Sequence, residues 1–377
     1  MMFDVSKQFQ ALTATRTATI ASVSTHRAAA DLAGAPVTTK GARIKNRAII
    51  FALVAALVCS VALVAGVSAR GADGSPALPR GGKVVAKIAI PQGVGGIAAG
   101  EGAVWVMSSA ASKLTRIDPA RNVAVARIKV APVLACPPFP ASCGEVAAGV
   151  GAVWVSLVPD NTVERIDPST NTVTATVPVG PQPEGIAVSP GAVWVANRGG
   201  PSVSRIDPAT NRVVATIAVG PTSACCSDHM AVTAGGGAIW VTVPNLNAVV
   251  RIDPATNRVA ATIKLSGKPC GFVIADAHAV WAAGAHCANI VTRMDPRKNK
   301  QTATVKGLTA PIGLGLGFRS LWVADLDAKA IDRVDPRTAR IVARLPVGGY
   351  PIRLAVGFGS VWVRDDTGRV LRIQPQP

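Results

Sequence analysis

The sequence predicts an all-β fold, a β-propeller of seven four-stranded blades. Three observations predict it: each Trp stands at the same point of a repeat, an Arg-apolar-Asp-Pro signature follows six of them, and the period is 40 to 49 residues. Short β-forming runs at such a period are typical of propeller blades. The tryptophans that mark the repeats are Trp105, Trp154, Trp194, Trp240, Trp281, Trp322 and Trp362.

Composition agrees with short strands separated by turns. Of 377 residues, 49% are hydrophobic, only 4% are aromatic, and Gly and Pro number 36 and 28. Val, Ile and Ala therefore carry most of the core, which favours β-strands over helices. Because a blade cannot bury its faces alone, the repeats should form one closed unit.

The third repeat shows how one blade is built. Four apolar runs between residues 185 and 217 predict strands A to D, and the turn Asp207-Pro208-Ala209-Thr210-Asn211 joins C to D. Pro fixes φ, Asp caps backbone N–H groups, and Asn tolerates the left-handed conformation. Arg205 and Asp207 are two apart on a strand, so they face the same way, and we expect a recurring ion pair between neighbouring blades.

The two ends of the repeat array complement each other. The last copy stops after its C strand at Arg372-Ile373, and an unassigned strand, Val84 to Ile90, precedes the first A strand. We expect this strand to complete the last blade beside Val370 to Ile373, because an open sheet edge would otherwise remain.

The N-terminal region predicts export. Residues 48–67 are uncharged and apolar and follow Arg43, Lys45 and Arg47. Such a run suits either a retained transmembrane anchor or a cleaved signal peptide, and both place the remainder outside the cytoplasm. The expected organisation is a disordered cytoplasmic tail or over-long start (1–47), the anchor or signal (48–69), a linker (70–83) and the propeller (84–377).

The net charge of the chain indicates which classes of partner it can bind. The net charge is +18, and without residues 1–69 there remain 32 basic and 19 acidic residues, a net charge of +13. A basic exported surface favours a protein or an anionic cell-envelope ligand. No basic-aromatic face for nucleic acid is present in the sequence, and we expect a monomer.

The repeat consensus V.RIDP.TN.VVATI.VG, seen at residues 203–219, closely resembles the YVTN or YncE-type family of seven-bladed propellers. The resemblance covers residues 84–377. It implies a seven-bladed, largely extracytoplasmic domain with no single shared activity. Some members of the wider superfamily look like lyases or subunits of quinoprotein dehydrogenases, so the resemblance predicts fold far more strongly than function.

The insertions and cysteines that break the repeat pattern are expected on one face of the disc. Antiparallel strands place the A–B and C–D turns on one face and the B–C and D–A loops on the other; the two long insertions and all six exported cysteines fall on the second. Disulfides are expected outside the cytoplasm. Cys270 and Cys287 should pair, Cys136 with Cys143 is the next candidate, and Cys225 and Cys226 bond either to each other or to that insertion.

Acidic residues gather at the start of three consecutive A strands. Aligning these starts brings Glu145, Glu184, Asp228 and His229 to one rim, with Arg353 across the channel mouth. Oxygen ligands with one imidazole suit a divalent cation or a cationic ligand. Solvated loop residues are the competing interpretation, since no fixed motif spacing links the four.

The leading functional hypothesis is a non-catalytic exported propeller that binds a protein or envelope ligand through its D–A and B–C loop face. A first alternative is a metal-dependent lyase or hydrolase that uses the acidic rim and His229. A second is a redox-partner subunit like those of quinoprotein dehydrogenases.

Overall fold

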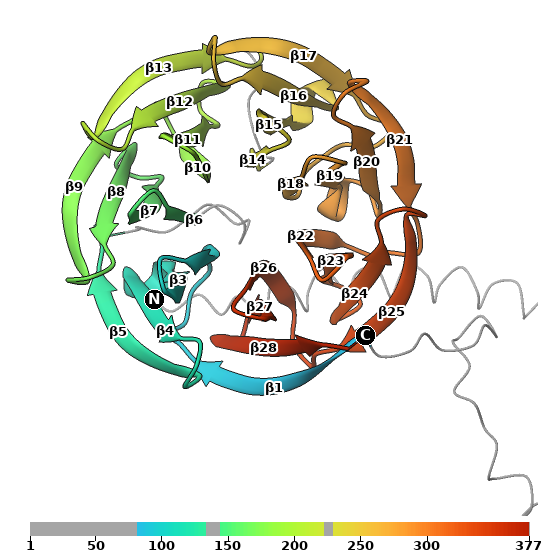
Figure 1. Cartoon of the computed structure of the whole chain (residues 1–377), viewed down its shortest axis with the longest axis horizontal. Helices are drawn as coiled ribbons and strands as arrows, with labels where there is room; N and C mark the ends of the chain where they lie inside the picture. The colour runs from blue at the N-terminus through green and yellow to red at the C-terminus, as the bar shows by residue number, and fades with distance from the viewer. Residues whose placement is uncertain (1–80, 133–143, 222–228, 377) are drawn as a thin grey trace, which may run out of the picture. The chain divides into compact units, whose positions relative to one another are not determined.

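Seven four-stranded antiparallel sheets surround a central axis in the computed structural model, which describes residues 81–132, 144–221 and 229–376 (Figure 1). Within each blade the A strand is innermost and the D strand outermost. The predicted seven-bladed propeller is confirmed. These residues belong to the unit Ala77–Pro377.

The strands of each blade follow in chain order, except in the last. Blades 1 to 3 are β2 Ile97–Gly100, β3 Ala103–Ser108, β4 Lys113–Asp118 and β5 Val123–Lys129; β6 Val146–Gly149, β7 Ala152–Leu157, β8 Thr162–Asp167 and β9 Thr172–Pro178; β10 Pro183–Ser189, β11 Ala192–Asn197, β12 Ser202–Asp207 and β13 Arg212–Ala218. Blades 4 and 5 are β14 Val232–Gly235, β15 Ala238–Val243, β16 Ala248–Asp253 and β17 Arg258–Lys264; β18 Val273–Ala275, β19 Val280–Ala283, β20 Val291–Asp295 and β21 Lys300–Val305. Blades 6 and 7 are β22 Pro311–Gly317, β23 Ser320–Asp325, β24 Ala330–Asp335 and β25 Arg340–Pro346; β26 Pro351–Gly357, β27 Ser360–Asp365, β28 Arg369–Pro375 and β1 Gly82–Ala89. Short 3-10 turns follow three B strands: η2 Ser109–Ala111, η3 Pro244–Leu246 and η4 Ala285–Cys287.

The repeated Trp and Arg link each blade to the next. Every Trp is fully buried, and the Arg guanidinium stacks on its ring at 5.1 to 5.7 Å. Nη1 of Arg205 then donates to Pro254 O at 2.9 Å and to Asn257 Oδ1 at 2.7 Å, in the C–D turn of the next blade. Cation–π stacking and hydrogen bonds thus recur around the ring.

The expected inter-blade ion pair between the repeat Arg and Asp is wrong. Asp207 accepts from Ala209 N at 2.9 Å and from the hydroxyl of Thr210 at 3.0 Å, both in its own turn. The carboxylate therefore caps its own turn, and the Arg binds the carbonyl and amide oxygens of the neighbouring turn instead.

The link from blade 5 to blade 6 differs from this pattern. Ala339 stands where five other C–D turns have Asn, and it adopts the left-handed conformation at φ 54°. Arg293 of the preceding blade donates to Thr302 Oγ1 of its own blade. The left-handed conformation costs roughly 1–2 kcal/mol for a residue with a Cβ, and Asn is among the residues that tolerate it best.

We expect Ala339→Asn to stabilise the protein by about 1 kcal/mol, because it relieves the backbone cost and offers Arg293 an amide acceptor. The measurement is the free energy of unfolding in denaturant. Ala339→Gly is the matched control, since it relieves the backbone without adding an acceptor. A melting point for Ala339→Asn at or below that of wild type would contradict the role assigned to this Asn.

The ring is closed by its N-terminal strand. β1 pairs antiparallel with β28 from Gly82 opposite Pro375 to Ala89 opposite Arg369, as the sequence predicts. Arg372 then donates to Pro119 O at 2.7 Å and to Asn122 Oδ1 at 2.9 Å, which ties blade 7 to blade 1. Ile88 and Ile90 are buried in the apolar cluster that these blades share.

Several predicted features lie outside the described residues: the tail 1–47, the apolar segment 48–69, most of the linker, and Cys136, Cys143, Cys225 and Cys226. Within the described residues no helix is long and apolar enough to span a bilayer. Cys270 and Cys287 form a disulfide with a Cα–Cα distance of 6.0 Å, which ties the start of blade 5 to η4.

Candidate functional site

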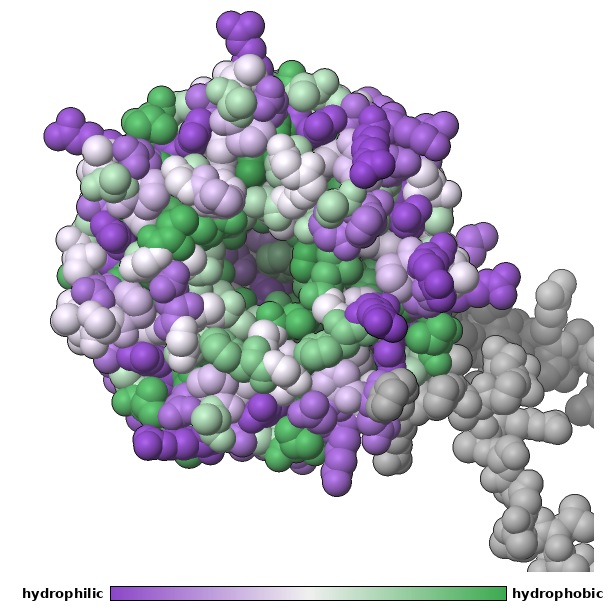
Figure 2. Space-filling view, in the orientation of Figure 1, coloured by the Kyte–Doolittle hydropathy of each residue, from purple (hydrophilic) through white to green (hydrophobic). Residues whose placement is uncertain are grey.

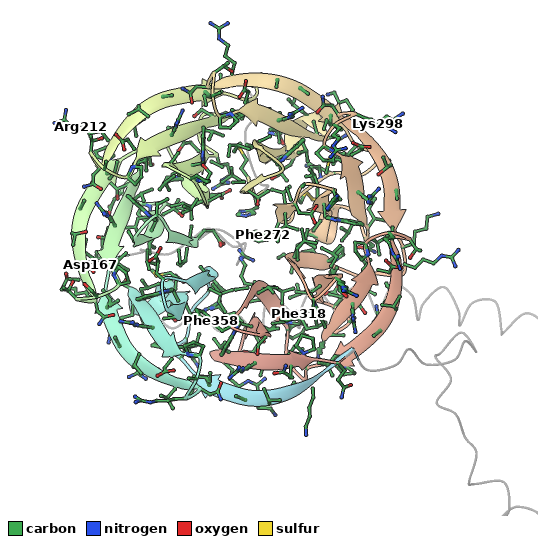
Figure 3. The ribbon with its side chains drawn as sticks, viewed as in Figure 1. Asp167, Arg212, Phe272, Lys298, Phe318 and Phe358 are labelled. Carbon is green, nitrogen blue, oxygen red and sulfur yellow. A yellow bond between two sulfur atoms is a disulfide. The ribbon has the colours of Figure 1, made fainter. Side chains whose placement is uncertain are left out.

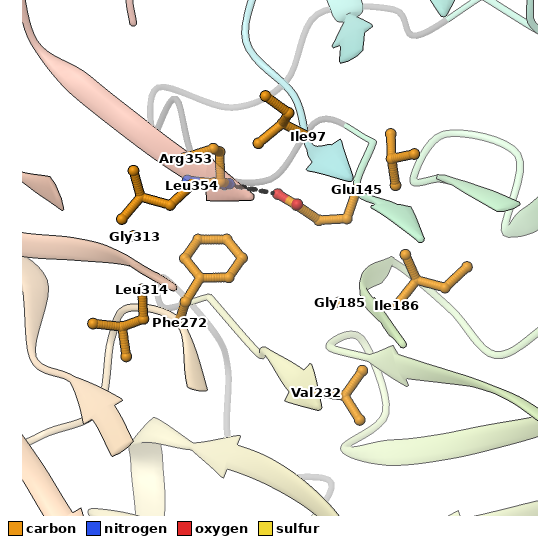
Figure 4. A pocket seen from close by; sticks show the side chains of 11 residues that line it. Ile97, Glu145, Gly185, Ile186, Val232, Phe272, Gly313, Leu314, Arg353 and Leu354 are labelled. Carbon is orange, nitrogen blue, oxygen red and sulfur yellow. Dashed lines mark hydrogen bonds and ion pairs between the residues drawn. The ribbon is translucent and has the colours of Figure 1, made fainter. Parts of the chain in front are cut away.

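A cavity of about 110 Å³ lies in the central channel, where the A strands begin (Figure 4). Aliphatic side chains from six blades form its wall, and three larger side chains also line it: Glu145, Phe272 and Arg353. The aliphatic residues are Ile97, Val146, Ile186, Val232, Leu314 and Leu354.

The residue nine positions before each Trp occupies the same place in every blade, and in five blades it lines this cavity. Four of the seven have little or no side chain: Gly96, Gly185, Ala231 and Gly313. A Cβ on Gly185 would lie 2.8 Å from Val232 N, and one on Gly313 would lie 2.8 Å from Ile352 O. Glycine is required there because neighbouring A strands approach too closely for a side chain.

Glu145 and Arg353 form an ion pair across the channel. Nε and Nη2 of Arg353 donate to Oε1 of Glu145 at 3.0 and 2.7 Å, and both residues are buried, with 7% and 3% of their surfaces exposed. The Arg353 guanidinium lies 3.8 Å from the centroid of Phe272, whose ring is at the centre of the disc (Figure 3). Cation–π stacking fixes the orientation of Arg353 toward Glu145.

Glu184 and His229 form a second buried group beside the ring. Glu184 is fully buried; its carboxylate lies 2.7 Å from Arg198 Nε and 3.4 Å from His229 Nδ1, and it accepts from Met230 N at 2.8 Å. Burial alone would raise the pKa of Glu184, but the hydrogen bond and charge of His229, the charge of Arg198 and the Met230 N–H together hold it below its usual value. The His229 ring packs against Phe272, with 4.6 Å between centroids and the ring planes tilted by 45°.

The structure brings the predicted rim residues together only in part. Glu145 and Arg353 meet at the cavity, whereas Glu184 and His229 pair outside its lining. Asp228 lies outside the described residues. Among the residues that are described, no three His, Cys, Asp or Glu side chains gather in a way that could hold a metal ion.

Two A strands were placed wrongly in the sequence alignment. In blade 4 the residue nine positions before the Trp is Ala231, two positions after His229, and in blade 5 it is Phe272, which the alignment of strand starts did not include. The long D–A loops obscure the start of the strand. Counting back from the buried Trp would have found Phe272, because the B strand fixes the register of the A strand beside it.

Arg364 is a site residue that the sequence analysis missed. It lies two residues after Trp362, directly opposite Arg353 in the β26–β27 register, and it is fully buried. At this position the other blades carry Met107, Ser156, Ala196, Thr242, Ala283 and Ala324. A charge that appears in a single blade is not required by the scaffold.

The guanidinium of Arg364 is only partly hydrogen-bonded. Its Nη2 donates to Gly93 O, whereas Nε and Nη1 have no hydrogen-bond partner among the described residues. Burial, then the nearby Arg353, lowers the pKa of Arg364 to about 10, so the side chain stays charged at neutral pH. The negative charges of Glu145, Asp365 and Asp366 oppose this lowering, so acidic groups already lie near the buried cation.

A third buried charged group lies in blade 6, away from the channel lining. Arg344 bonds Asp332 through Nε at 2.6 Å and Nη2 at 2.9 Å, and its Nη2 also lies 3.4 Å from Asp325 Oδ2. Asp325 in turn caps the backbone N–H groups of Thr309 and Ala310. The group joins strands β23, β24 and β25, and we interpret it as structural.

The burial of Asp332 in this group predicts an unusual pH dependence of the free energy of unfolding. Burial raises the pKa of Asp332 from 3.8 to about 6, against the opposing effect of Arg344. Between these values the unfolded chain ionises before the folded one, so stability falls as the pH rises from about 4 to about 6, by roughly 3 kcal/mol. We expect Asp332→Asn to flatten this part of the unfolding curve and the exposed Asp327→Asn to leave it unchanged. An identical slope in Asp332→Asn and wild type would refute the assignment.

Comparison with known structures supports the fold. Hydrazine synthase from Kuenenia stuttgartiensis matches with a TM-score of 0.62 at 15% identity, over 76% of this chain and 96% of that one. Virginiamycin B lyase from Staphylococcus aureus matches with a TM-score of 0.62 at 16% identity, over 77% and 99%. A streptogramin B lyase matches with a TM-score of 0.61 at 16% identity, over 79% and 97%. The sequence matches no family model and no curated protein. At these identities the likeness shows a common fold alone.

Proposed function

We propose that the chain is an extracytoplasmic, non-catalytic propeller of the YVTN or YncE type that binds a protein or cell-envelope ligand through its D–A and B–C loop face. The observation that carries the proposal is the cavity at the A-strand starts, where Glu145, Phe272 and Arg353 line a largely aliphatic channel. An apolar pocket with a few convergent polar groups is the usual form of a ligand site.

The contacts within the cavity support binding over catalysis. Glu145 and Arg353 are the ionisable residues of its lining, and they are bonded to each other. A general acid or base must reach the substrate through a hydrogen bond, and the hydrogen bonds from Arg353 already occupy Oε1 of Glu145. Fixed charges of this kind suit recognition of a complementary group.

The proposed location rests on residues 48–67, which would attach the propeller to the outer face of a membrane or direct its secretion. The remaining charge of +13 suits an anionic envelope surface. Protease added outside intact cells should then cleave the propeller region of the full chain. Full protection in intact cells, with cleavage only after lysis, would contradict the location.

Phenylalanines on the two faces of the disc allow a matched test of which face binds the ligand. Phe272 lines the cavity, whereas Phe318 and Phe358 lie in A–B turns and are 39% and 40% exposed. With the full chain kept in detergent so that residues 48–67 do not insert into membrane, we expect Phe272→Ala to weaken its sedimentation with isolated cell envelopes at least tenfold. Phe318→Ala and Phe358→Ala should leave it unchanged. Loss of binding in the A–B turn variants alone would move the site to the opposite face.

A metal-dependent lyase or hydrolase is the second candidate, supported by the Glu184–His229 pair and by Nε2 of His229, which has no hydrogen-bond partner among the described residues. Arg198 and Met230 N already compensate the Glu184 carboxylate, which weakens its attraction for a cation. Calorimetric titration with Ca²⁺, Mg²⁺, Mn²⁺ and Zn²⁺ tests this candidate: it requires binding that His229→Ala abolishes, and the absence of any binding would remove it.

A further inference from the structure

The chain enters the propeller on the face that carries the A–B and C–D turns. β1 is the D strand of blade 7, and its first residue, Gly82, pairs with Pro375 at the end of the C strand β28. Residues 68–80 separate the apolar segment 48–67 from Gly81, and a fully extended chain of that length spans at most about 47 Å. The A–B and C–D turn face is therefore the one joined to the segment that is proposed to attach the propeller to a membrane.

Two exposed aromatic side chains stand in A–B turns of this face. Phe318 and Phe358 are 39% and 40% exposed, and both adopt the left-handed conformation, at φ 53° and 49°. This conformation is unfavourable for a bulky residue, and blade 4 has Gly236 at the same position of its turn. The two residues belong to blades 6 and 7, and Figure 3 shows them on the same side of the disc as β1. Large apolar groups thus lie in water, at a backbone cost, beside the point where the chain enters.

The same face carries an excess of positive charge. Ten exposed basic residues and the seven half-buried repeat arginines lie at its turns and at the starts of its D strands, against eight acidic residues, a difference of nine charges. Figure 2 shows this face, with hydrophilic side chains projecting around the rim and apolar surface around the central hollow. The exposed basic residues are Lys83, Arg121, Arg212, Arg258, Arg297, Lys298, Lys300, Arg319, Arg337 and Arg340, and the acidic ones are Glu101, Asp118, Asp167, Asp207, Asp253, Asp276, Asp295 and Asp335.

We propose that the A–B and C–D turn face lies on the surface of a membrane that contains anionic lipids. Phe318 and Phe358 enter the headgroup region, and the basic turns lie against the lipid phosphates. Aromatic side chains favour the membrane interface, and basic residues near it are attracted to anionic lipids. The D–A and B–C loops then point away from the membrane, which leaves the channel mouth accessible to its ligand. The inference rests on the proposed attachment through residues 48–67 and adds the orientation of the propeller.

The test is quenching of an introduced Trp by brominated lipid. The full chain is reconstituted into vesicles of phosphatidylcholine and phosphatidylglycerol, with and without bromine on the acyl chains. We expect the fluorescence that Phe358→Trp adds to be quenched at least twofold. Asp327→Trp, in an exposed B–C turn of the opposite face, is the matched control and should not be quenched. The seven native tryptophans are fully buried and give the same background in both variants.

The role of lipid charge is tested with the same variants. In vesicles of phosphatidylcholine alone, the quenching of Phe358→Trp should fall at least twofold, because the basic turns lose the anionic headgroups that they contact. Thermal melts of both variants show whether they remain folded. In detergent the micelle takes the place of the membrane at this face whether or not envelopes are present, so the A–B turns remain unaffected in the envelope-binding measurements.

The outcomes separate the orientation from the attachment. Absence of quenching in a folded Phe358→Trp variant, equal quenching of Asp327→Trp, or equal quenching in neutral and anionic vesicles overturns the inference. Flotation of the vesicles shows whether the full chain is attached at all. A chain that floats with its introduced Trp unquenched contradicts the orientation alone, whereas a chain that does not float contradicts the proposed attachment together with the orientation.

Discussion

Deleting residues 81–91, which contain β1, should abolish cooperative unfolding of the propeller. The deletion removes the partner of β28 along its length and exposes the cluster that buries Ile88 and Ile90. Each fully buried Ile contributes about 1.5–3 kcal/mol, and the lost strand ladder adds to this, against a typical total stability of about 5–15 kcal/mol. Thermal unfolding followed by circular dichroism is the measurement.

Deleting residues 70–80 is the matched control, because it removes a segment of equal length and leaves β1 intact. A synthetic peptide of residues 81–91, added to the truncated chain, should restore part of the transition. If the β1 deletion melts cooperatively at the wild-type temperature, the ring does not depend on its N-terminal strand.

Replacing Glu145 by Ala should give the largest effect of any single substitution at the cavity. It leaves Arg353 buried beside Arg364 without the carboxylate that pairs with it, and removing one partner of a buried ion pair costs about 3–5 kcal/mol. The free energy of unfolding in urea is the measurement. Glu101→Ala, at an A–B turn, is the control and should cost less than about 1 kcal/mol.

The double variant Glu145→Met and Arg353→Met makes this prediction specific. Because apolar replacement of a whole buried ion pair is often neutral, the double variant should recover most of the stability that Glu145→Ala loses. A double variant less stable than Glu145→Ala would show that the residues contribute through packing rather than through their charges.

The fold could be predicted from the sequence because scaffold residues repeat. Trp, Arg, Asp-Pro and Asn recur in nearly every blade, and the copies of each residue play the same structural role. Trp194 fills the core, Arg205 binds the next turn, and Asn257 takes the left-handed conformation. Closure of the ring by β1 was predicted because the last repeat lacks a D strand and an extra strand precedes the first repeat. The mistaken Arg–Asp ion pair shows the limit of this reasoning. The direction of a side chain does not show which of several nearby acceptors it will bind.

The site was harder to predict because it consists of residues that break the repeat. Glu145 and Arg353 were identified among the A-strand starts, but their ion pair spans 208 positions and depends on closure of the ring. Phe272 was missed because loop length hid the strand register. Arg364 was missed because a lone Arg on a B strand resembles the other basic residues until its burial is known.

Hydrogen–deuterium exchange of the full chain, with and without isolated cell envelopes, tests most directly whether the channel mouth is the binding face. We expect slower exchange on binding in peptides that contain residues 144–146, 270–273 and 351–354, and unchanged exchange in the A–B turns at 316–320 and 356–360. Slower exchange confined to those A–B turns, or no change anywhere, would contradict a binding site at the channel mouth.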